Sequence, residues 1–356
     1  MAASFVAHDP AFADIVGANP TIDLLVEFDE YPFAHEAGVF FENADNTDSL
    51  YITSNRFLRP GTEDEQIVRI SHVTLARHGS DARTAATTVH TEMTAVSEAV
   101  PTGNGGVNFS YSFAEGAAPE DAVLFCAQGS RAQPSGLYAM QVAAPNKVEL
   151  VLSDFFGRPF NSVNDVVVAT SQKAGPGSIW FTDPPYGYEQ GYRDRPMLPS
   201  QVYRYDPVRK SMRAMADGLG HPNGICFSPD ENVVYITDTD WLHGSGETDD
   251  ARASTIYAYD VISVSGEPFL ANRRLFAMAD NGIPDGIKCD LHGNVYSGCG
   301  DGVHVWSPGG VLLGRIKVEG GAANFCFGRD GEMFLLNETR LWRAQLGSVK
   351  GALLGI

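Results

Sequence analysis

The sequence is poor in basic residues. Its 356 residues include 25 lysines and arginines against 44 aspartates and glutamates, which gives a formal net charge of −19. Proteins that bind nucleic acids need a basic surface to neutralise phosphates. The charge therefore argues against a nucleic-acid partner. An acidic surface instead favours solubility and attracts cations.

Cysteines are also few, and no CxxC pair occurs among them. Their number is odd, five, and most stand inside apolar runs such as "LFCAQ" and "NFCFG". This pattern favours buried, reduced thiols over a disulfide framework.

No apolar run is long enough to span a bilayer. The N-terminus, "MAASFVAHDPAF", lacks the basic stretch and apolar run of a signal peptide. We therefore expect no membrane association and, for the chain as given, a cytoplasmic location, with a trimmed secreted form left open. The sequence predicts no oligomeric state.

Helical periodicity is scarce, and short β runs bounded by Gly, Pro, Asn and Asp recur instead. Six segments share one pattern, in which a polar residue opens an apolar strand that turns and returns on a second strand. We call these openers the six leading residues: Glu36, Asn104, Asn164, Asn223, Asp285 and Asn324. The matching returns are residues 50–55, 123–129, 179–183, 234–238, 295–299 and 333–337.

Further strands are predicted between each return and the next leading residue, for example at 201–207, 255–261 and 302–308. Units of about four strands predict an all-β, six-bladed β-propeller with four-stranded blades. The lack of amphipathic helices disfavours a stack of βαβ units. We expect one domain over residues 1–356, in which the first ~20 residues are an extension or part of blade closure. Residues 21–28 are predicted to complete the last blade.

The innermost strands of a propeller line its channel, so equivalent leading residues would converge near one end of the axis. Carboxylates and amide oxygens without His or Cys suit Ca²⁺, Mg²⁺ or Mn²⁺, and carboxylates also bind Zn²⁺. The alternative is that Asn and Asp open these turns by bonding to loop backbone.

Two further candidates lie near this predicted ring. His35 precedes Glu36, and next-door residues on a strand point to opposite faces. It could therefore belong to a rim or pack against a neighbour, or it could contact substrate or transfer a proton. Tyr186 and Tyr188 belong to the loop 183–199, which either roofs the channel mouth or simply connects two strands. No G-x-S-x-G elbow supports serine-hydrolase chemistry.

The motifs "NSVNDVVV…GSIWFTDPPYG", "HPNGICFSPDENVVYITDTD" and "PDGIKCDLHGNVYSGCGDGVHVWSPGGVLLG" resemble the SMP-30/gluconolactonase family, in particular its bacterial and fungal lactonohydrolases. The similarity runs from about Glu36 to Leu341. It implies a six-bladed propeller that binds one divalent cation and hydrolyses lactones of sugar acids or related compounds.

The resemblance also implies roles for single residues. Glu36, Asn223 and Asp285 correspond to metal ligands, and Asn164 to an asparagine beside metal and substrate. Asp285 also corresponds to the catalytic base, and Asn104 to a substrate-site asparagine.

Three departures from the family pattern bear on the substrate. Val163 replaces the proline of "NSPND", the first motif reads "EAGVFF" without a proline, and Ser162 stands where animal members have an arginine. Asp165 and Asp183 are expected to brace loops, Asp183 by capping the turn into "PPYG".

The sequence therefore predicts a metal-dependent hydrolase that opens a small-molecule lactone, with Ca²⁺ the cation expected first. One alternative is a natural-product enzyme that uses the same pocket for dehydration or cyclisation of an apolar substrate, for example by cycloaddition. A second is a non-catalytic propeller that binds calcium or a partner.

Overall fold

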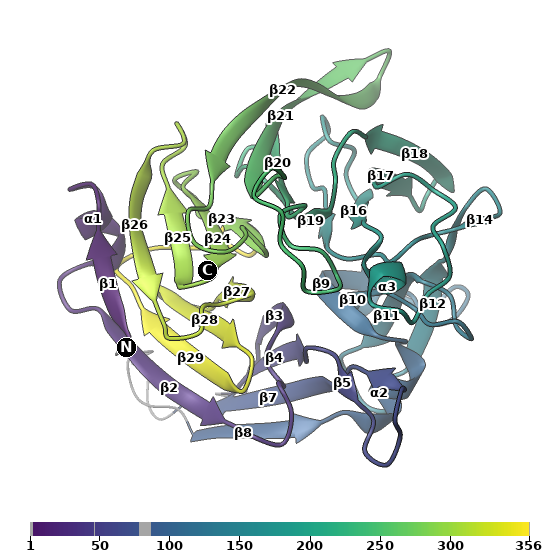
Figure 1. Ribbon diagram of the computed structural model, residues 1–356, viewed down its shortest axis with the longest axis horizontal. Coiled ribbons are helices and arrows are strands. Elements are labelled where there is room, and N and C mark those ends of the chain that lie inside the picture. The colour runs from purple at the N-terminus through teal and green to yellow at the C-terminus, as the bar shows by residue number, and fades with distance from the viewer. Residues whose placement is uncertain (1–2, 46, 78–86, 356) are drawn as a thin grey trace.

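Short antiparallel strands form six sheets that are arranged in a ring around a central axis (Figure 1). The computed structural model describes residues 3–45, 47–77 and 87–355. The architecture is a six-bladed β-propeller, which confirms the predicted fold class.

The first three blades follow the chain in order. Blade 1 consists of β3 (Glu36–Glu42), β4 (Thr47–Thr53), β7 (Ile70–Ala76) and β8 (Thr87–Glu92). Blade 2 consists of β9 (Gly103–Tyr111), β10 (Glu120–Ala127), β11 (Gly136–Gln141) and β12 (Val148–Leu152). Blade 3 consists of β15 (Val166–Val168), β16 (Ile179–Asp183), β17 (Gln201–Asp206) and β18 (Ser211–Ala216).

The other three blades complete the ring. Blade 4 consists of β19 (Pro222–Phe227), β20 (Val233–Asp238), β21 (Thr255–Val264) and β22 (Glu267–Met278). Blade 5 consists of β23 (Ile287–Cys289), β24 (Val295–Cys299), β25 (Gly302–Trp306), β26 (Leu312–Lys317) and, outermost, β1 (Ser4–Ala7). Blade 6 consists of β27 (Asn324–Phe327), β28 (Glu332–Asn337), β29 (Arg340–Gln345) and β2 (Thr21–Glu27).

Short elements lie in the connections between these strands. The two small hairpins are β5 (Phe57–Leu58) with β6 (Gln66–Ile67), and β13 (Asp154–Phe155) with β14 (Arg158–Pro159). The helices are α1 (Phe12–Val16), α2 (Thr94–Ala99) and α3 (Tyr186–Glu189). Within the described ranges, no helix is both long and apolar enough to cross a membrane.

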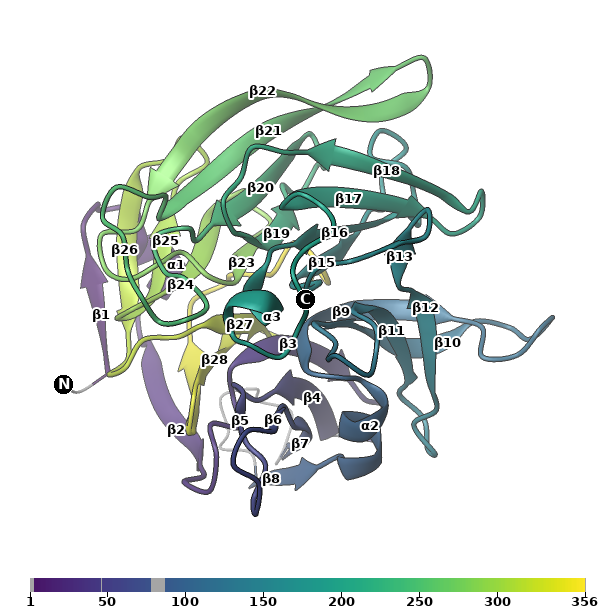
Figure 2. The same cartoon turned by 45° about the vertical axis from the view of Figure 1, so that its right-hand side comes forward.

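The ring closes through the N-terminal part of the chain. β2 pairs antiparallel with β29, Ile22 opposite Ala344, which confirms the strand predicted at 21–28. β1 pairs with β26 and adds a fifth strand to blade 5, which the repeat pattern did not predict. Figures 1 and 2 show the purple N-terminal strands beside the latest strands of the chain. This pairing covers the outer edges of blades 5 and 6.

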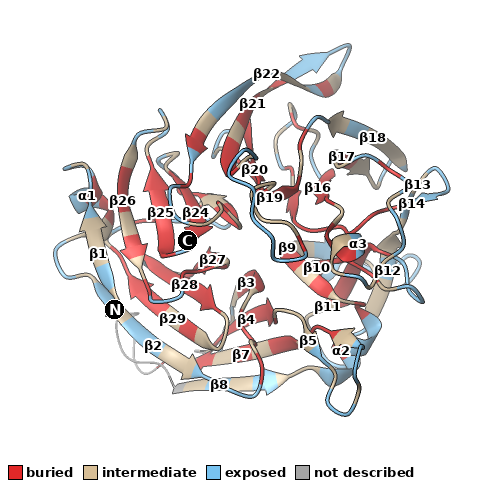
Figure 3. Ribbon diagram, viewed as in Figure 1, coloured by how far each residue is buried: buried red, intermediate tan, exposed pale blue. Residues whose placement is uncertain are grey.

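The hydrophobic core lies between blades rather than at a single centre. Each of the six blade junctions holds a separate cluster of buried apolar side chains. At the junction of blades 3 and 4, the rings of Trp180 and Phe227 meet edge to face at 5.4 Å. Figure 3 shows buried residues along the inner strands and exposed ones at outer tips such as the β21–β22 hairpin. The five cysteines are buried and free, as predicted.

The first strands of the blades line the axis and contact one another in order, from β3 through β9, β15, β19 and β23 to β27 and back to β3. Both ends of the axis are hollowed. Five of the six leading residues line the cavity at one end. The cavity at the other end is lined by inner-strand residues, many of them apolar but including Asn108 and Lys288, and by residues 351–354 of the C-terminal segment.

Candidate active site

The six leading residues all stand at or just before the start of an innermost strand. Five of them line one cavity of about 200 Å³: Glu36, Asn104, Asn164, Asn223 and Asp285. The sixth, Asn324, is fully buried and donates its Nδ2–H to Glu36 Oε2 at 2.7 Å. The structure thus brings together all six positions that the repeat singled out.

Threonine hydroxyls of the returning strands hydrogen-bond to the backbone of three leading residues and fix their positions along the axis. The hydroxyl of Thr53 donates to the backbone carbonyl of Asn104 at 2.9 Å, across the junction of blades 1 and 2. Thr182 holds the carbonyl of Asn223 in the same way at 2.6 Å, and Thr237 holds that of Asp285 at 3.1 Å. Each leading residue in this set is therefore positioned by the blade before it.

The glycine that follows a leading residue leaves room for the next blade. A Cβ atom at Gly105 would lie 2.6 Å from the backbone oxygen of Asn164, and one at Gly286 would lie 2.3 Å from the side chain of Asn324. Asn104 and Asp285 can therefore lie this close to the next blade because glycine follows each of them.

Three buried oxygens at this site have no hydrogen-bond partner among the residues that the structure describes: Asn104 Oδ1, Asn164 Oδ1 and Asp285 Oδ1. They belong to three different blades, and all three residues line the same cavity. Leaving such atoms unpaired is costly. Oxygens left free around one cavity are the donor set that a divalent cation with hard-ligand preference would satisfy.

The electrostatics point the same way. Burial, reinforced by repulsion from Asp285, raises the pKa of Glu36 to about 8. Burial also raises the pKa of Asp285 to about 6, although the positive charge of His35 and a hydrogen bond from Asn223 oppose this shift. Burial therefore disfavours the charged forms of both carboxyls, and a cation bound between them would favour those forms, so these residues fit a bound cation.

His35 lies at the edge of this site and lines the same cavity. Its Nδ1 is 2.8 Å from Glu338 Oε1, and Glu338 also accepts a hydrogen bond from Asn55. Burial alone would lower the pKa of His35, but the Glu338 carboxylate outweighs it and raises the pKa to about 9. A protonated imidazole therefore stands beside the two buried carboxyls.

The tyrosines of the loop 183–199 lie in different surroundings. Tyr186, in α3, is buried, lines the cavity, and hydrogen-bonds through its hydroxyl to Thr239 Oγ1. Tyr188 is 49% exposed and lies outside the cavity lining. The loop thus contributes Tyr186, and also Gln190, to this site.

The neighbouring aspartates brace loops. Asp165 accepts the backbone N–H groups of Val166 and, from the next blade, Ile225. The sequence predicts that Asp183 caps the turn into "PPYG". In the structure, its side chain instead accepts the N–H groups of Asn161 and Ser162. It thereby fixes the segment that leads to Asn164.

The departures at 162 and 163 are structural as well. Ser162 Oγ accepts the N–H of Gly187 at 2.7 Å and so holds α3. Val163 is fully buried in the core between blades 2 and 3 and does not face the cavity. The expectation that Val163 marks a changed substrate site is therefore not supported by its position.

Several polar side chains of the cavity were missed from the sequence: Asn55, Arg56, Gln128, Gln190 and His243. Asn55 and Gln128 stand at the ends of predicted return strands, so the polar endings of those strands were a usable signal. Arg56 supplies a guanidinium to the cavity, although Ser162 stands at the position compared above with an arginine. The other residues lie on loops whose path the repeat does not determine.

A family model described as "SMP-30/Gluconolactonase/LRE-like region" matches residues 80–336. The chain belongs to this family. Lactonohydrolase oryL of Aspergillus oryzae is 31% identical over 208 residues, which cover 54% of this chain and 45% of oryL. A gluconolactonase of Zymomonas mobilis is 31% identical over 201 residues, 53% of this chain and 51% of the relative. The chain thus spans about half the length of these curated relatives.

Solved structures of the SMP-30/gluconolactonase fold cover nearly the whole chain. A gluconolactonase from Xanthomonas campestris has a TM-score of 0.67 at 25% identity and covers 96% of this chain and 94% of its own. A calcium-binding regucalcin from Agrobacterium tumefaciens has a TM-score of 0.56 at 16% identity, with 92% and 95% covered, and this likeness shows the fold alone.

Proposed function

We propose that the protein hydrolyses the ester ring of a small lactone with the help of one divalent cation. The observation that carries this proposal is the set of unpartnered buried oxygens of Asn104, Asn164 and Asp285 around one cavity. Membership in a family whose relatives include gluconolactonases and lactonohydrolases supports the reaction class.

Glu36, Asn164, Asn223 and Asp285 would hold the cation, with Ca²⁺ favoured by an all-oxygen donor set. The free Oδ1 of Asn104 would contact the substrate beside the cation. When bound, the cation supplies Lewis acidity that polarises the lactone carbonyl and stabilises the oxyanion. Asn324 holds Glu36 by its hydrogen bond to Oε2 and thus orients one of the ligands.

Asp285 is the proposed general base. Its carboxylate takes a proton from the attacking water as the water oxygen bonds to the carbonyl carbon. The ring C–O bond then breaks, and the departing oxygen takes up a proton, so that lactone and water give one hydroxy acid. His35 and Tyr186, which line the cavity, are proposed to contact the substrate beside the reacting atoms.

The cavity lining favours a hydroxylated substrate over an apolar one. Asn55, Arg56, Gln128 and Gln190 offer amide and guanidinium groups to the cavity. Groups of this kind match the hydroxyls of an aldonolactone. Asn55, Arg56 and Gln128 each use part of their hydrogen-bonding capacity on protein partners, and an apolar ligand would leave the remainder unpaired. Dehydration or cyclisation of an apolar substrate therefore has less support.

The test measures acid release from a panel of aldonolactones by the purified protein. Activity is expected to disappear after chelation, to return with Ca²⁺, and to fall at least ~100-fold in Asp285→Asn. Asp194→Asn, at a carboxylate that is 91% exposed, is the matched control and is expected to keep full activity.

Activity that survives both chelation and Asp285→Asn would refute the mechanism. Tight Ca²⁺ binding by calorimetry without turnover of any lactone would instead support a calcium-binding propeller.

A further inference from the structure

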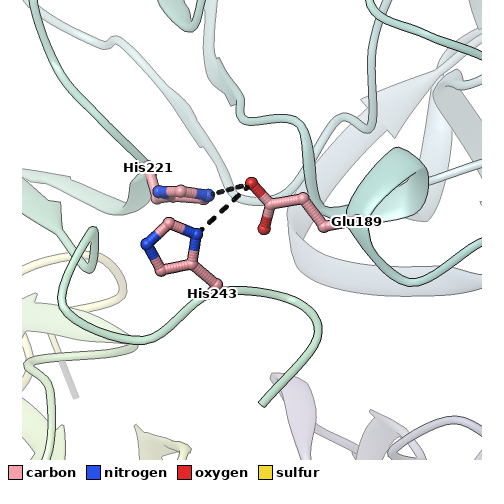
Figure 4. Close-up of side chains that lie close together, drawn as sticks. All are labelled: Glu189, His221 and His243. Carbon is pink, nitrogen blue, oxygen red and sulfur yellow. Dashed lines mark hydrogen bonds and ion pairs between the residues drawn. The ribbon is translucent and has the colours of Figure 1, made fainter. Parts of the chain in front are cut away.

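A second group of ligand-type side chains, none of them a leading residue, lies beside the same cavity, which one of the three, His243, also lines. Glu189 ends α3, His221 directly precedes β19, and His243 lies on the loop between β20 and β21. Figure 4 shows the three side chains turned toward one another. The Glu189 Oε1 atom is 2.8 Å from His221 Nε2 and 4.0 Å from His243 Nδ1. One ligand atom from each residue lies within 4.8 Å of the others.

Neighbouring groups already orient two of these three side chains. His221 Nδ1 is 2.8 Å from Asp240 Oδ1, which directs Nε2 toward Glu189 and His243. Glu189 Oε2 accepts the N–H of Gly244 at 2.7 Å, which leaves Oε1 to face both imidazoles. A histidine that gives one nitrogen to a carboxylate and presents the other to a shared centre is the usual arrangement around protein-bound metals.

The three side chains differ in how far they are exposed to solvent. The His221 side chain is only 4% exposed, whereas that of His243 is 35% exposed. His243 and Gly244 also line the cavity that contains Glu36 and Asp285. The centre is therefore anchored on the protein side and open toward the cavity, as in metal sites that keep an exchangeable position.

We propose that Glu189, His221 and His243 form a second cation site, selective for a nitrogen-preferring metal of the Zn²⁺ class. Two imidazoles and one carboxylate suit Zn²⁺ or Co²⁺, whereas the oxygen-only ring of leading residues suits Ca²⁺. Ligand atoms about 2.0 to 2.1 Å from a tetrahedral ion stand roughly 3.3 Å apart. The present separations of 2.8 and 4.0 Å reach this value by small side-chain shifts.

Binding has a defined proton balance. Without an ion, His221 contacts a carboxylate through each nitrogen, so both nitrogens can carry protons. Binding releases the Nε2 proton to solvent, and Nδ1–H stays bonded to Asp240. An occupied site would join the loops of blades 3 and 4 across the cavity mouth.

The competing interpretation is that His221 is simply an imidazolium that pairs with Glu189 through one nitrogen and with Asp240 through the other.

Co²⁺ is the probe, because its visible d–d absorption reports nitrogen ligands and low coordination number. The purified full chain is titrated with Co²⁺ and then with competing Zn²⁺. We expect a one-to-one absorption band that Zn²⁺ removes. His243→Ala, on an accessible loop, is expected to lose the band and bind at least ~100-fold more weakly. Glu189→Gln, of equal size, is expected to weaken binding as well.

Two controls separate this site from the leading residues. His292→Ala removes an exposed histidine outside this cavity and is expected to leave the titration unchanged. Glu36→Gln is expected to keep the Co²⁺ band while losing Ca²⁺ binding. The proposal is overturned if the parent shows no band, if His243→Ala keeps it, or if Glu36→Gln removes it. Because the readout is binding, its failure is distinguishable from a failure of lactone hydrolysis.

Discussion

At the scale of single residues, the site depends on side chains that themselves do not line the cavity. Asn324 is fully buried, yet its Nδ2–H fixes Glu36 Oε2 at 2.7 Å while its own Oδ1 accepts the N–H of Phe325. A carboxylate held in one orientation offers its other oxygen to a ligand without losing further side-chain entropy. Asn324 therefore acts through Glu36.

Replacing Asn324 by leucine keeps the volume and removes the hydrogen bond. We expect Asn324→Leu to weaken Ca²⁺ binding by about 10- to 100-fold, measured by titration calorimetry, because Glu36 is no longer held. Asn19→Leu, at an exposed asparagine, is the control and should bind as the parent does. Equal affinities in all three proteins would show that Glu36 does not depend on Asn324.

Asp301 makes the stability of blade 5 sensitive to acid. Its carboxylate accepts a hydrogen bond from His304 Nε2 at 2.6 Å and lies 3.0 Å from Lys317 Nζ. Burial alone would raise its pKa, but these partners outweigh burial and lower the pKa to about 2. Because the folded-state pKa lies below the unfolded value, Asp301 stabilises the fold above about pH 4, and this stabilisation disappears between about pH 4 and pH 2.

Asp301→Asn should therefore lower the free energy of unfolding by about 1 to 2 kcal/mol at pH 7. The difference from the parent should shrink as the pH falls below about 4, because the parent then loses the same charge. Urea unfolding from pH 7 to pH 3 measures this. A gap that stays constant with pH would rule out the charge of Asp301 as its cause.

The leading residues could be predicted from sequence because each repeats at the same place in a unit. The residues that complete the site could not. Arg56 and His243 reach the cavity from connections of different lengths, so no periodicity marks them. Asn324 was singled out by the repeat, but its role toward Glu36 appears only when blades 6 and 1 become neighbours.

At the scale of elements, the glycines that follow three of the leading residues, Gly105, Gly224 and Gly286, allow the inner strands of neighbouring blades to approach closely. Gly286 follows Asp285 at the start of blade 5, and a Cβ atom there would lie 2.3 Å from Asn324 Oδ1 at the start of blade 6. At this junction, no residue larger than glycine fits between Asp285 and Asn324 without displacing one of them.

We expect Gly286→Ala to destabilise the protein by about 1 to 3 kcal/mol in chemical denaturation, because the methyl group displaces Asn324 or forces β23 away from β27. Ca²⁺ affinity should fall with it, since Asn324 holds Glu36. The control is Gly309→Ala, where the nearest atom to the new Cβ is 3.8 Å away. Similar unfolding free energies for the two variants would contradict the packing argument.

The strands themselves were predictable because turn residues bound them on both sides. The turns "SPDEN" and "DLHGN" join β19 to β20 and β23 to β24, as their composition indicated. α3 was not predicted. Its four residues are too few to show helical periodicity. Its position depends on a distant contact, because Ser162, in the segment before β15, accepts the N–H of Gly187.

At the scale of the whole molecule, the number of blades and the closing strand at residues 21–28 could be predicted from the sequence, whereas the ionic contacts that help to close the ring could not. Closure uses β2 against β29, and also a buried ionic group that joins blades 1 and 6. Arg77 donates Nη1 and Nη2 to the two carboxylate oxygens of Glu332, both at 2.6 Å, and Nε to Asp48 Oδ2 at 2.6 Å. Residues 255 positions apart thus meet at the junction.

This ionic group should contribute to closure because its members are shielded from water. The Arg77 side chain is 4% exposed, and those of Asp48 and Glu332 are fully buried. Removing the guanidinium leaves two buried carboxylates with less positive charge beside them. Of the remaining guanidinium groups, that of Arg329 pairs with Asp48, and that of Arg343 lies 3.6 Å from Glu332. Breaking such a group from one side typically costs about 3 to 5 kcal/mol.

We therefore expect Arg77→Met to lower the free energy of unfolding by about 3 to 5 kcal/mol, measured by urea denaturation at pH 7. Arg59→Met is the matched control, because its pair with Glu65 is exposed and should contribute less than about 1 kcal/mol. Adding Glu332→Gln to Arg77→Met should recover part of the loss, since one buried charge is then neutral. Equal losses for Arg77→Met and Arg59→Met would mean that strand pairing and apolar packing close the ring without this group.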